Sequence, residues 1–120
     1  MHELSIATGI VEIVEQHVAV ERRPDVRTVT VAVGDYSGVV PEALTFSFEV
    51  VAADAGIEEA RLEIRRVPVV LRCPGCGHEV EQEPPLPACP GCGGKRLEMV
   101  SGSELQVLEV ELEDRAEETS

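Results

Sequence analysis

The sequence predicts an α+β fold in which two helices cover a small three-stranded sheet, with an inserted lobe built on four cysteines. Apolar residues recur at helical spacing in the first 20 positions, and apolar and polar residues alternate in three later segments. All four cysteines lie between positions 73 and 92. The core must consist of Val, Leu, Ile and Ala, because aromatic residues make up only 2% of the chain.

Residues 4–20 form the first expected helix. Its apolar side chains fall at i, i+3 and i+4 spacing, at Leu4, Ala7, Ile10, Val11, Val14 and Val18. We expect the segment around Pro24 to end this helix, since proline cannot continue one. Residues 26–33 then alternate, and this pattern predicts a half-buried strand with Val29, Val31 and Val33 on one face.

Pro41 marks the start of the second expected helix, because proline is favoured in the first turn. Gly56 is a typical stop at the C-terminal end of a helix. Residues 60–67 and 104–112 alternate again and are expected to form the second and third strands. The 27 residues between Val33 and Arg61 hold a helix, which is the length of a parallel βαβ crossover.

The charge of the chain excludes several classes of partner. The 120 residues (12.9 kDa) carry 10 Lys plus Arg against 23 Asp plus Glu, which gives a formal net charge of −13. We therefore expect no binding to nucleic acid, which needs clustered basic side chains and aromatic stacking platforms. No apolar run approaches the roughly 18 residues of a membrane span. The first five residues lack the features of a signal peptide, so we expect a cytoplasmic protein without a membrane partner.

Two Cys-x-x-Cys pairs, Cys73 with Cys76 and Cys89 with Cys92, are separated by 12 residues. In a reducing compartment, such pairs indicate metal ligands rather than disulfides. Four thiolates suit tetrahedral Zn(II), so we expect a zinc-ribbon lobe with a closed structural site. The main alternative is an iron centre of the rubredoxin type, although the insert has no aromatic side chain to shield the iron. His78 is interpreted as a surface histidine or as a secondary metal ligand.

Met1, His2 and Glu3 offer the ligands of a second metal site. The α-amine of Met1, the backbone nitrogen of His2 and its imidazole can close two fused chelate rings on one metal. Ni(II) and Cu(II) can displace the backbone proton and accept square-planar nitrogen sets. Glu3 could complete the plane through its carboxylate or its backbone nitrogen. From the spacing alone, the favoured interpretation is a frayed chain terminus with Glu3 at a helix start.

The order of the motifs along the whole chain resembles the HypA/HybF family. The segments that carry the resemblance are residues 1–5 (MHELS), 33–34 (VG), 40–46 (VPEALTF), the two cysteine pairs and 102–105 (GSEL). Members of this family are nickel metallochaperones for [NiFe]-hydrogenase maturation, and some also serve urease. The resemblance implies a mixed sheet, a nickel site on Met1, His2 and Glu3, and structural zinc on Cys73, Cys76, Cys89 and Cys92.

The resemblance also implies delivery of Ni(II), together with a nickel-binding GTPase accessory protein, to the immature hydrogenase large subunit. We expect the carrier to be a monomer or a weak homodimer. Some family members have a histidine after each cysteine pair, whereas here only His78 is present. Some members place an acid near nickel in the loop where Val40 and Pro41 stand, so that only Asp35 or Glu42 could substitute.

These inferences predict three parts of the chain. Residues 1–68 and 101–113 form a nickel-binding α+β domain, residues 69–100 form a zinc-binding domain, and residues 114–120 form an acidic C-terminal tail. The alternative function is a zinc-ribbon protein-interaction module without nickel transfer. An enzyme is not expected, because the sequence has no nucleophile–base pair at motif spacing and no phosphate-binding loop.

Overall fold

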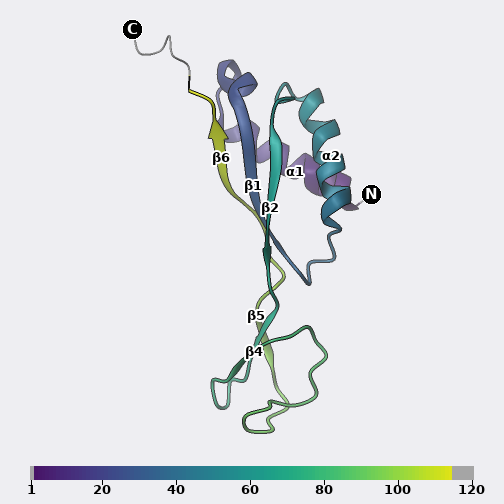
Figure 1. Cartoon of the computed structure of the whole chain (residues 1–120), viewed down its shortest axis with the longest axis vertical. Helices are drawn as coiled ribbons and strands as arrows, with labels where there is room; N and C mark the ends of the chain where they lie inside the picture. The colour runs from purple at the N-terminus through teal and green to yellow at the C-terminus, as the bar shows by residue number, and fades with distance from the viewer. Residues whose placement is uncertain (1, 115–120) are drawn as a thin grey trace. The chain divides into compact units, whose positions relative to one another are not determined.

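The computed structural model describes residues 2–114; Met1 and residues 115–120, with most of the predicted acidic tail, lie outside the described residues. The chain divides into two compact units. Unit 1 holds the residues up to Val31, Val39–Arg65 and those from Gln106 onward, and unit 2 holds Ala32–Gly38 and Arg66–Leu105. With helices, small sheets and a cluster of four cysteines, the predicted α+β fold class is confirmed (Figure 1).

The first helix, α1, spans His2–His17 and buries the predicted apolar stripe at Ala7, Ile10, Val11 and Val14. It ends three residues before the predicted residue 20, because Ala19 is extended, with φ −59° and ψ 148°. The chain then forms a short 3₁₀ helix, η1, over Val20–Asp25, with Pro24 inside it. The second helix, α2, spans Pro41–Asp54, begins with proline as predicted, and packs against α1.

One sheet has the strand order β2-β1-β6, with bounds Arg61–Val67, Val26–Gly34 and Leu105–Leu112. The ends of the strands fix their directions. The Asp35 N–H donates to the Val67 carbonyl at the ends of β1 and β2, whereas Glu113 at the end of β6 donates to Asp25 before β1. The sheet is therefore mixed, and β6 runs opposite to β1 and β2 (Figure 1).

The central strand β1 is more deeply buried than the alternation predicts. Thr30 and Ala32 alternate with Val29, Val31 and Val33 and would face solvent in a half-buried strand, but they are buried as well. The prediction of a half-buried strand was wrong in this respect. A small or β-branched residue such as Ala or Thr fits a buried face without a long polar side chain, so its presence in an alternating pattern does not establish exposure.

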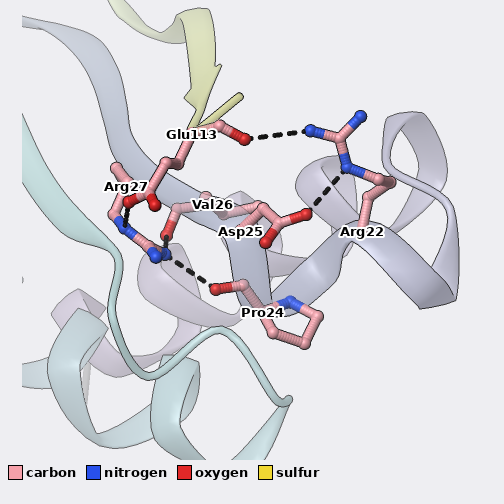
Figure 2. Close-up of polar contacts among 6 residues, drawn as sticks. All are labelled: Arg22, Pro24, Asp25, Val26, Arg27 and Glu113. Atoms are coloured by element: carbon pink, nitrogen blue, oxygen red, sulfur yellow. Dashed lines mark hydrogen bonds and ion pairs between the residues drawn. The ribbon is translucent and has the colours of Figure 1, made fainter. Parts of the chain in front are cut away.

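Arg22 and Arg27 hold the residue after β6, Glu113, against the start of β1 (Figure 2). The Arg22 guanidinium donates to the Asp25 carboxylate at 2.8 Å and to the Glu113 carbonyl at 3.1 Å. Arg27 donates to the Glu113 carboxylate at 2.9 Å and to the Pro24 carbonyl at 2.7 Å. Because the Glu113 N–H also donates to Asp25, this residue is fixed by its backbone and its side chain.

Unit 2 contains a second sheet that the sequence analysis did not predict. Three short antiparallel strands, β3 (Val70–Arg72), β4 (Glu79–Glu81) and β5 (Glu98–Ser101), are arranged in the order β4-β3-β5. Leu71 at the centre of β3 pairs with Val80 of β4 and Met99 of β5. Strands of three or four residues are too short to show a period of two, so the pattern of apolar residues did not reveal them.

Gly34 and Gly102 allow two backbone segments of unit 2 to approach closely. A Cβ atom added at Gly34 would overlap the carbonyl group of Gly102, and Gly102 itself has φ +120°. The Tyr36 N–H donates to this same carbonyl at 2.7 Å. Since a methyl group at Gly34 would meet backbone rather than a movable side chain, the contact cannot relax cheaply.

We expect Gly34→Ala to lower the free energy of unfolding by about 1–3 kcal/mol, because the added methyl group forces two backbone segments apart. Urea unfolding followed by circular dichroism measures this change. The matched control is Gly9→Ala in α1, where an added Cβ meets nothing within 4 Å. That substitution should raise the stability by about 0.5–1 kcal/mol. Equal effects of the two substitutions would contradict the close approach at Gly34.

Candidate metal centres

The first cysteine pair forms a tight turn directly after β3. The Cys73 N–H donates to the His78 carbonyl at 2.9 Å, and the Gly77 N–H donates back to the Cys73 carbonyl at 2.7 Å. Gly77 has φ +79°, a backbone conformation that side-chain-bearing residues rarely adopt. The turn leaves Cys73 buried and Cys76 exposed, with both thiols on the same small loop.

The second pair repeats this turn. The Cys89 N–H donates to the Gly94 carbonyl at 2.7 Å, and the Gly93 N–H donates to the Cys89 carbonyl at 2.8 Å, with Gly93 at φ +78°. Cys89 is buried and Cys92 is exposed, as in the first turn. The repeated Cys-Pro-Gly-Cys-Gly segment therefore encodes two equivalent knuckles.

The two knuckles bring all four sulfur atoms to one point. The Sγ atoms of Cys73, Cys76, Cys89 and Cys92 all lie within 4.8 Å of one another. Two pairs, Cys73 with Cys92 and Cys76 with Cys89, are each 3.6 Å apart. Tetrahedral zinc with Zn–S bonds of about 2.3 Å requires sulfur atoms about 3.8 Å apart, so the donor type and the spacing both fit such an ion.

The protonation of these thiols reflects their crowding. The backbone N–H of Cys92 and that of Gly91, which lies 3.3 Å from the Cys89 sulfur, stabilise the thiolate and lower the pKa of Cys89 to about 6. Although the backbone N–H of His78 acts in the same direction, the hydrogen bond with Cys89 and the other neighbouring thiols raise the pKa of Cys76 to about 12. Four thiolates can coexist in this space only around a cation, which supplies the opposite charge.

His78 lies beside the second knuckle and is not part of the four-cysteine group. Its Cγ atom is 3.5 Å from the position that a Cβ atom on Gly91 would occupy. Among residues 2–114, the four cysteines form the one group of three or more His, Cys, Asp or Glu side chains arranged to hold a metal ion. Lys95 and Arg96 line the same cavity as Cys73 and Cys92.

His2 and Glu3 occupy the first turn of α1, and Met1 lies outside the described residues. The Glu3 carboxylate accepts a hydrogen bond of 3.1 Å from the backbone N–H of Val40, the residue that precedes α2. Its Oε2 atom is also 3.9 Å from Nδ1 of His2, whose side chain is 61% exposed. Glu3 thus connects the start of α1 to the start of α2 and places a negative charge beside the imidazole.

The Val40 N–H is a functional group that the sequence analysis missed. Val40 has no side-chain oxygen to cap α2, and a carboxylate from another helix contacts its backbone instead. Of the two acids considered as substitutes in this loop, Asp35 forms an ion pair of 2.9 Å with Arg66, and Glu42 lies exposed in the first turn of α2. The sequence offered one indication of this contact. A hydrophobic residue directly before the first proline of a helix cannot cap that helix with its own side chain, so a group from elsewhere in the chain has to do so.

The hydrogen bond from Val40 lowers the pKa of Glu3 below its ordinary value of 4.5. A lowered pKa means that the folded chain favours the ionised carboxylate, so this interaction is present at neutral pH and is lost in acid. We expect the Val40 amide proton to shift in NMR spectra as Glu3 is protonated, with a midpoint below 4.5. Glu3→Gln should abolish this titration; its persistence in that variant would show that another group causes it.

Comparisons with known proteins identify the family of this chain. A family model described as "Hydrogenase/urease nickel incorporation, metallochaperone, hypA" matches residues 1–112. The hydrogenase maturation factor HypA of Geobacter metallireducens is 44% identical over 113 residues, which cover 94% of this chain and all of that protein. The protein of the same name from Solidesulfovibrio magneticus is 43% identical over 117 residues, with the same coverage of both chains.

Two solved structures share the fold. The solution structure of the nickel metallochaperone HypA from Helicobacter pylori is 22% identical, with a TM-score of 0.64 over 92% of this chain and 96% of that chain. A second HypA solution structure is 24% identical, with a TM-score of 0.71 over 93% and 96% of the two chains. No helix within residues 2–114 combines the length and the apolar character needed to cross a membrane. From the match over residues 1–112 and the identities above 40%, the chain belongs to the HypA family of nickel-incorporation metallochaperones.

Proposed function

We propose that this chain is a non-enzymatic carrier that binds Ni(II) through Met1, His2 and Glu3 and holds a structural Zn(II) ion on its four cysteines. It hands nickel, together with a nickel-binding GTPase accessory protein, to the hydrogenase large subunit in the cytoplasm. Urease is the second client that we propose, because the family description includes it. The proposal rests on the placement of His2 and Glu3 in the first turn of α1, beside the start of α2.

The first turn of a helix suits a chelate that uses backbone nitrogen. The first four N–H groups of an α-helix have no acceptor within the helix. Ni(II) can therefore displace the amide proton of His2 without breaking a helical hydrogen bond. The amine of Met1, this amide nitrogen and the His2 imidazole supply three nitrogen donors in one plane, a set that square-planar Ni(II) accepts, and Glu3 supplies the fourth ligand.

Charge favours the same assignment. A dication at the start of α1 is repelled by the positive end of the helix dipole. The deprotonated amide of His2 and the Glu3 carboxylate together cancel the charge of the ion. The Val40 N–H contacts one oxygen of this carboxylate, Oε2, so we assign the fourth ligand to the other oxygen, and the hydrogen bond positions the turn.

The two proposed sites differ in how readily they release metal. The four cysteines enclose their ion, and such a closed set keeps no position open for exchange. When bound, Zn(II) supplies a cross-link between the two knuckles, whose buried apolar neighbours in unit 2 include only a few side chains such as Val69 and Leu71. The His2 side chain is largely exposed, so a partner can replace the donors one at a time.

Affinity alone cannot give selectivity for nickel. Copper binds nitrogen donors more strongly than nickel does in the general order of divalent metal affinities. Selective transfer therefore requires docking with a specific partner, which offers the next ligand set only in the correct complex. The net charge of −13 favours a partner with a basic contact surface.

The nickel site is tested by calorimetric titration of the zinc-loaded chain, beginning at Met1, with Ni(II). A Gly-Ser extension before Met1 removes the amine from the chelate, and His2→Ala removes the imidazole. We expect each change to weaken nickel binding at least about 100-fold, because a direct ligand is lost. His17→Ala is the matched control, since this histidine lies at the other end of α1. Equal binding by the extended and unextended chains would refute the amine as a ligand.

The zinc site is tested by metal analysis of two variants. Cys76→Ala should abolish stoichiometric zinc and disorder unit 2, while nickel binding by the N-terminal residues is retained. His78→Ala should leave one zinc per chain, because the four thiolates already complete the coordination. Loss of zinc from the His78 variant would instead make the histidine a ligand. Full zinc content in the Cys76 variant would rule out the four-cysteine assignment.

A further inference from the structure

The outward side of α2 carries exposed apolar residues. Phe46 is 68% exposed and Val50 is 54% exposed. They are four positions apart and therefore adjacent on the helix surface, and exposed Ala53 continues the same side. The opposite side of the helix is buried through Leu44, Phe48 and Ala52. The exposure of Phe46 is notable because the chain has only three aromatic residues.

Acidic residues border the apolar strip that Phe46, Val50 and Ala53 form. Glu42, Glu49 and Asp54 are exposed, and within residues 2–114 none of them has an ion-pair partner. Residues 41–54 contain no Lys or Arg. Asp54 lies in the last turn, where the helix dipole is also negative. Basic side chains from another protein would neutralise all three carboxylates, so the strip and its border are complementary to an apolar pocket surrounded by Lys and Arg.

A second apolar surface in unit 1 fits such a partner less well. A groove between α1 and β6 is lined by Ile13, Val18 and Leu108, among others. Its acidic residue, Glu109, already contacts Arg65 at 3.8 Å. Charge complementarity with a basic partner therefore favours α2 over this groove.

The position of the strip along α2 connects it to the cargo. Val40, directly before the helix, donates its N–H to Glu3. Phe46 is six residues further on, which corresponds to about 9 Å along the helix axis. A protein that docks on Phe46 can therefore present its own metal ligands close to His2. Aromatic side chains at the centre of an interface commonly provide a large part of the binding energy.

We propose that Phe46 and Val50, bordered by Glu42, Glu49 and Asp54, form the docking surface for the protein that exchanges nickel with this chain. The partner presents an apolar pocket surrounded by Lys and Arg. This inference rests on the proposed function, since it concerns the partner in nickel transfer. What it adds is the surface of α2 that recognises the partner.

The test measures binding of the full-length, zinc-loaded chain to the purified nickel-binding GTPase accessory protein. We expect Phe46→Ala to raise the dissociation constant at least about tenfold. Alanine has a higher helix propensity than phenylalanine, so this exposed substitution should not unfold α2. The double variant Glu49→Gln with Asp54→Asn should reduce the dependence of binding on salt concentration, because two charge contacts are lost.

Leu108→Ala is the matched control, because it removes an exposed apolar side chain from the competing groove. It should leave binding unchanged. Weakening by Leu108→Ala with no effect of Phe46→Ala would overturn the proposal, as would the absence of any binding by the unmodified chain. Nickel titrations of the same samples measure nickel binding independently of partner binding. Normal nickel binding with no effect of Phe46→Ala on the partner would reject only the docking surface.

Discussion

The crowding of four cysteine sulfur atoms is the constraint on which unit 2 depends. Atoms within 4.8 Å of one another cannot all carry a negative charge unless a cation lies among them. The glycine turns and the six β3–β4 and β3–β5 pairings serve to bring the two knuckles to this point. The apolar core of the unit is small, so we expect order in this part of the chain to depend on metal binding as well as on burial of apolar surface.

Unit 1 depends on a different kind of interaction. Two helices start next to each other, and the Glu3 carboxylate joins these starts through the Val40 N–H. A negative group is favourable at both positions, because each helix presents its positive dipole end there. A metal held on exposed donors near this carboxylate is accessible, whereas a metal among the cysteines is enclosed. In the function that we propose, one small chain therefore retains one ion and releases another.

The sequence contained the signals for much of this arrangement, and particular residues explain the limits. The Cys-Pro-Gly-Cys repeats predicted the cysteine cluster, because ligand spacing is a local property. Pro41 predicted the start of α2, because its fixed φ suits a first helical turn. The strands of the second sheet were too short to show alternation, and Thr30 gave no sign of its burial in β1. The contact of Glu3 with Val40 uses a backbone N–H, which every residue except proline has, so no residue type identifies it.

The course of the chain through the two units limits how the protein can be divided. Unit 2 is assembled from Ala32–Gly38 and Arg66–Leu105, and the hydrogen bonds of Asp35 with Val67 and of Tyr36 with Gly102 join these stretches. A fragment cut around the cysteines alone would lack the first stretch and expose the groups that it covers. The cysteine lobe is thus not a transferable module, and recombination between relatives would succeed only if both stretches were exchanged together.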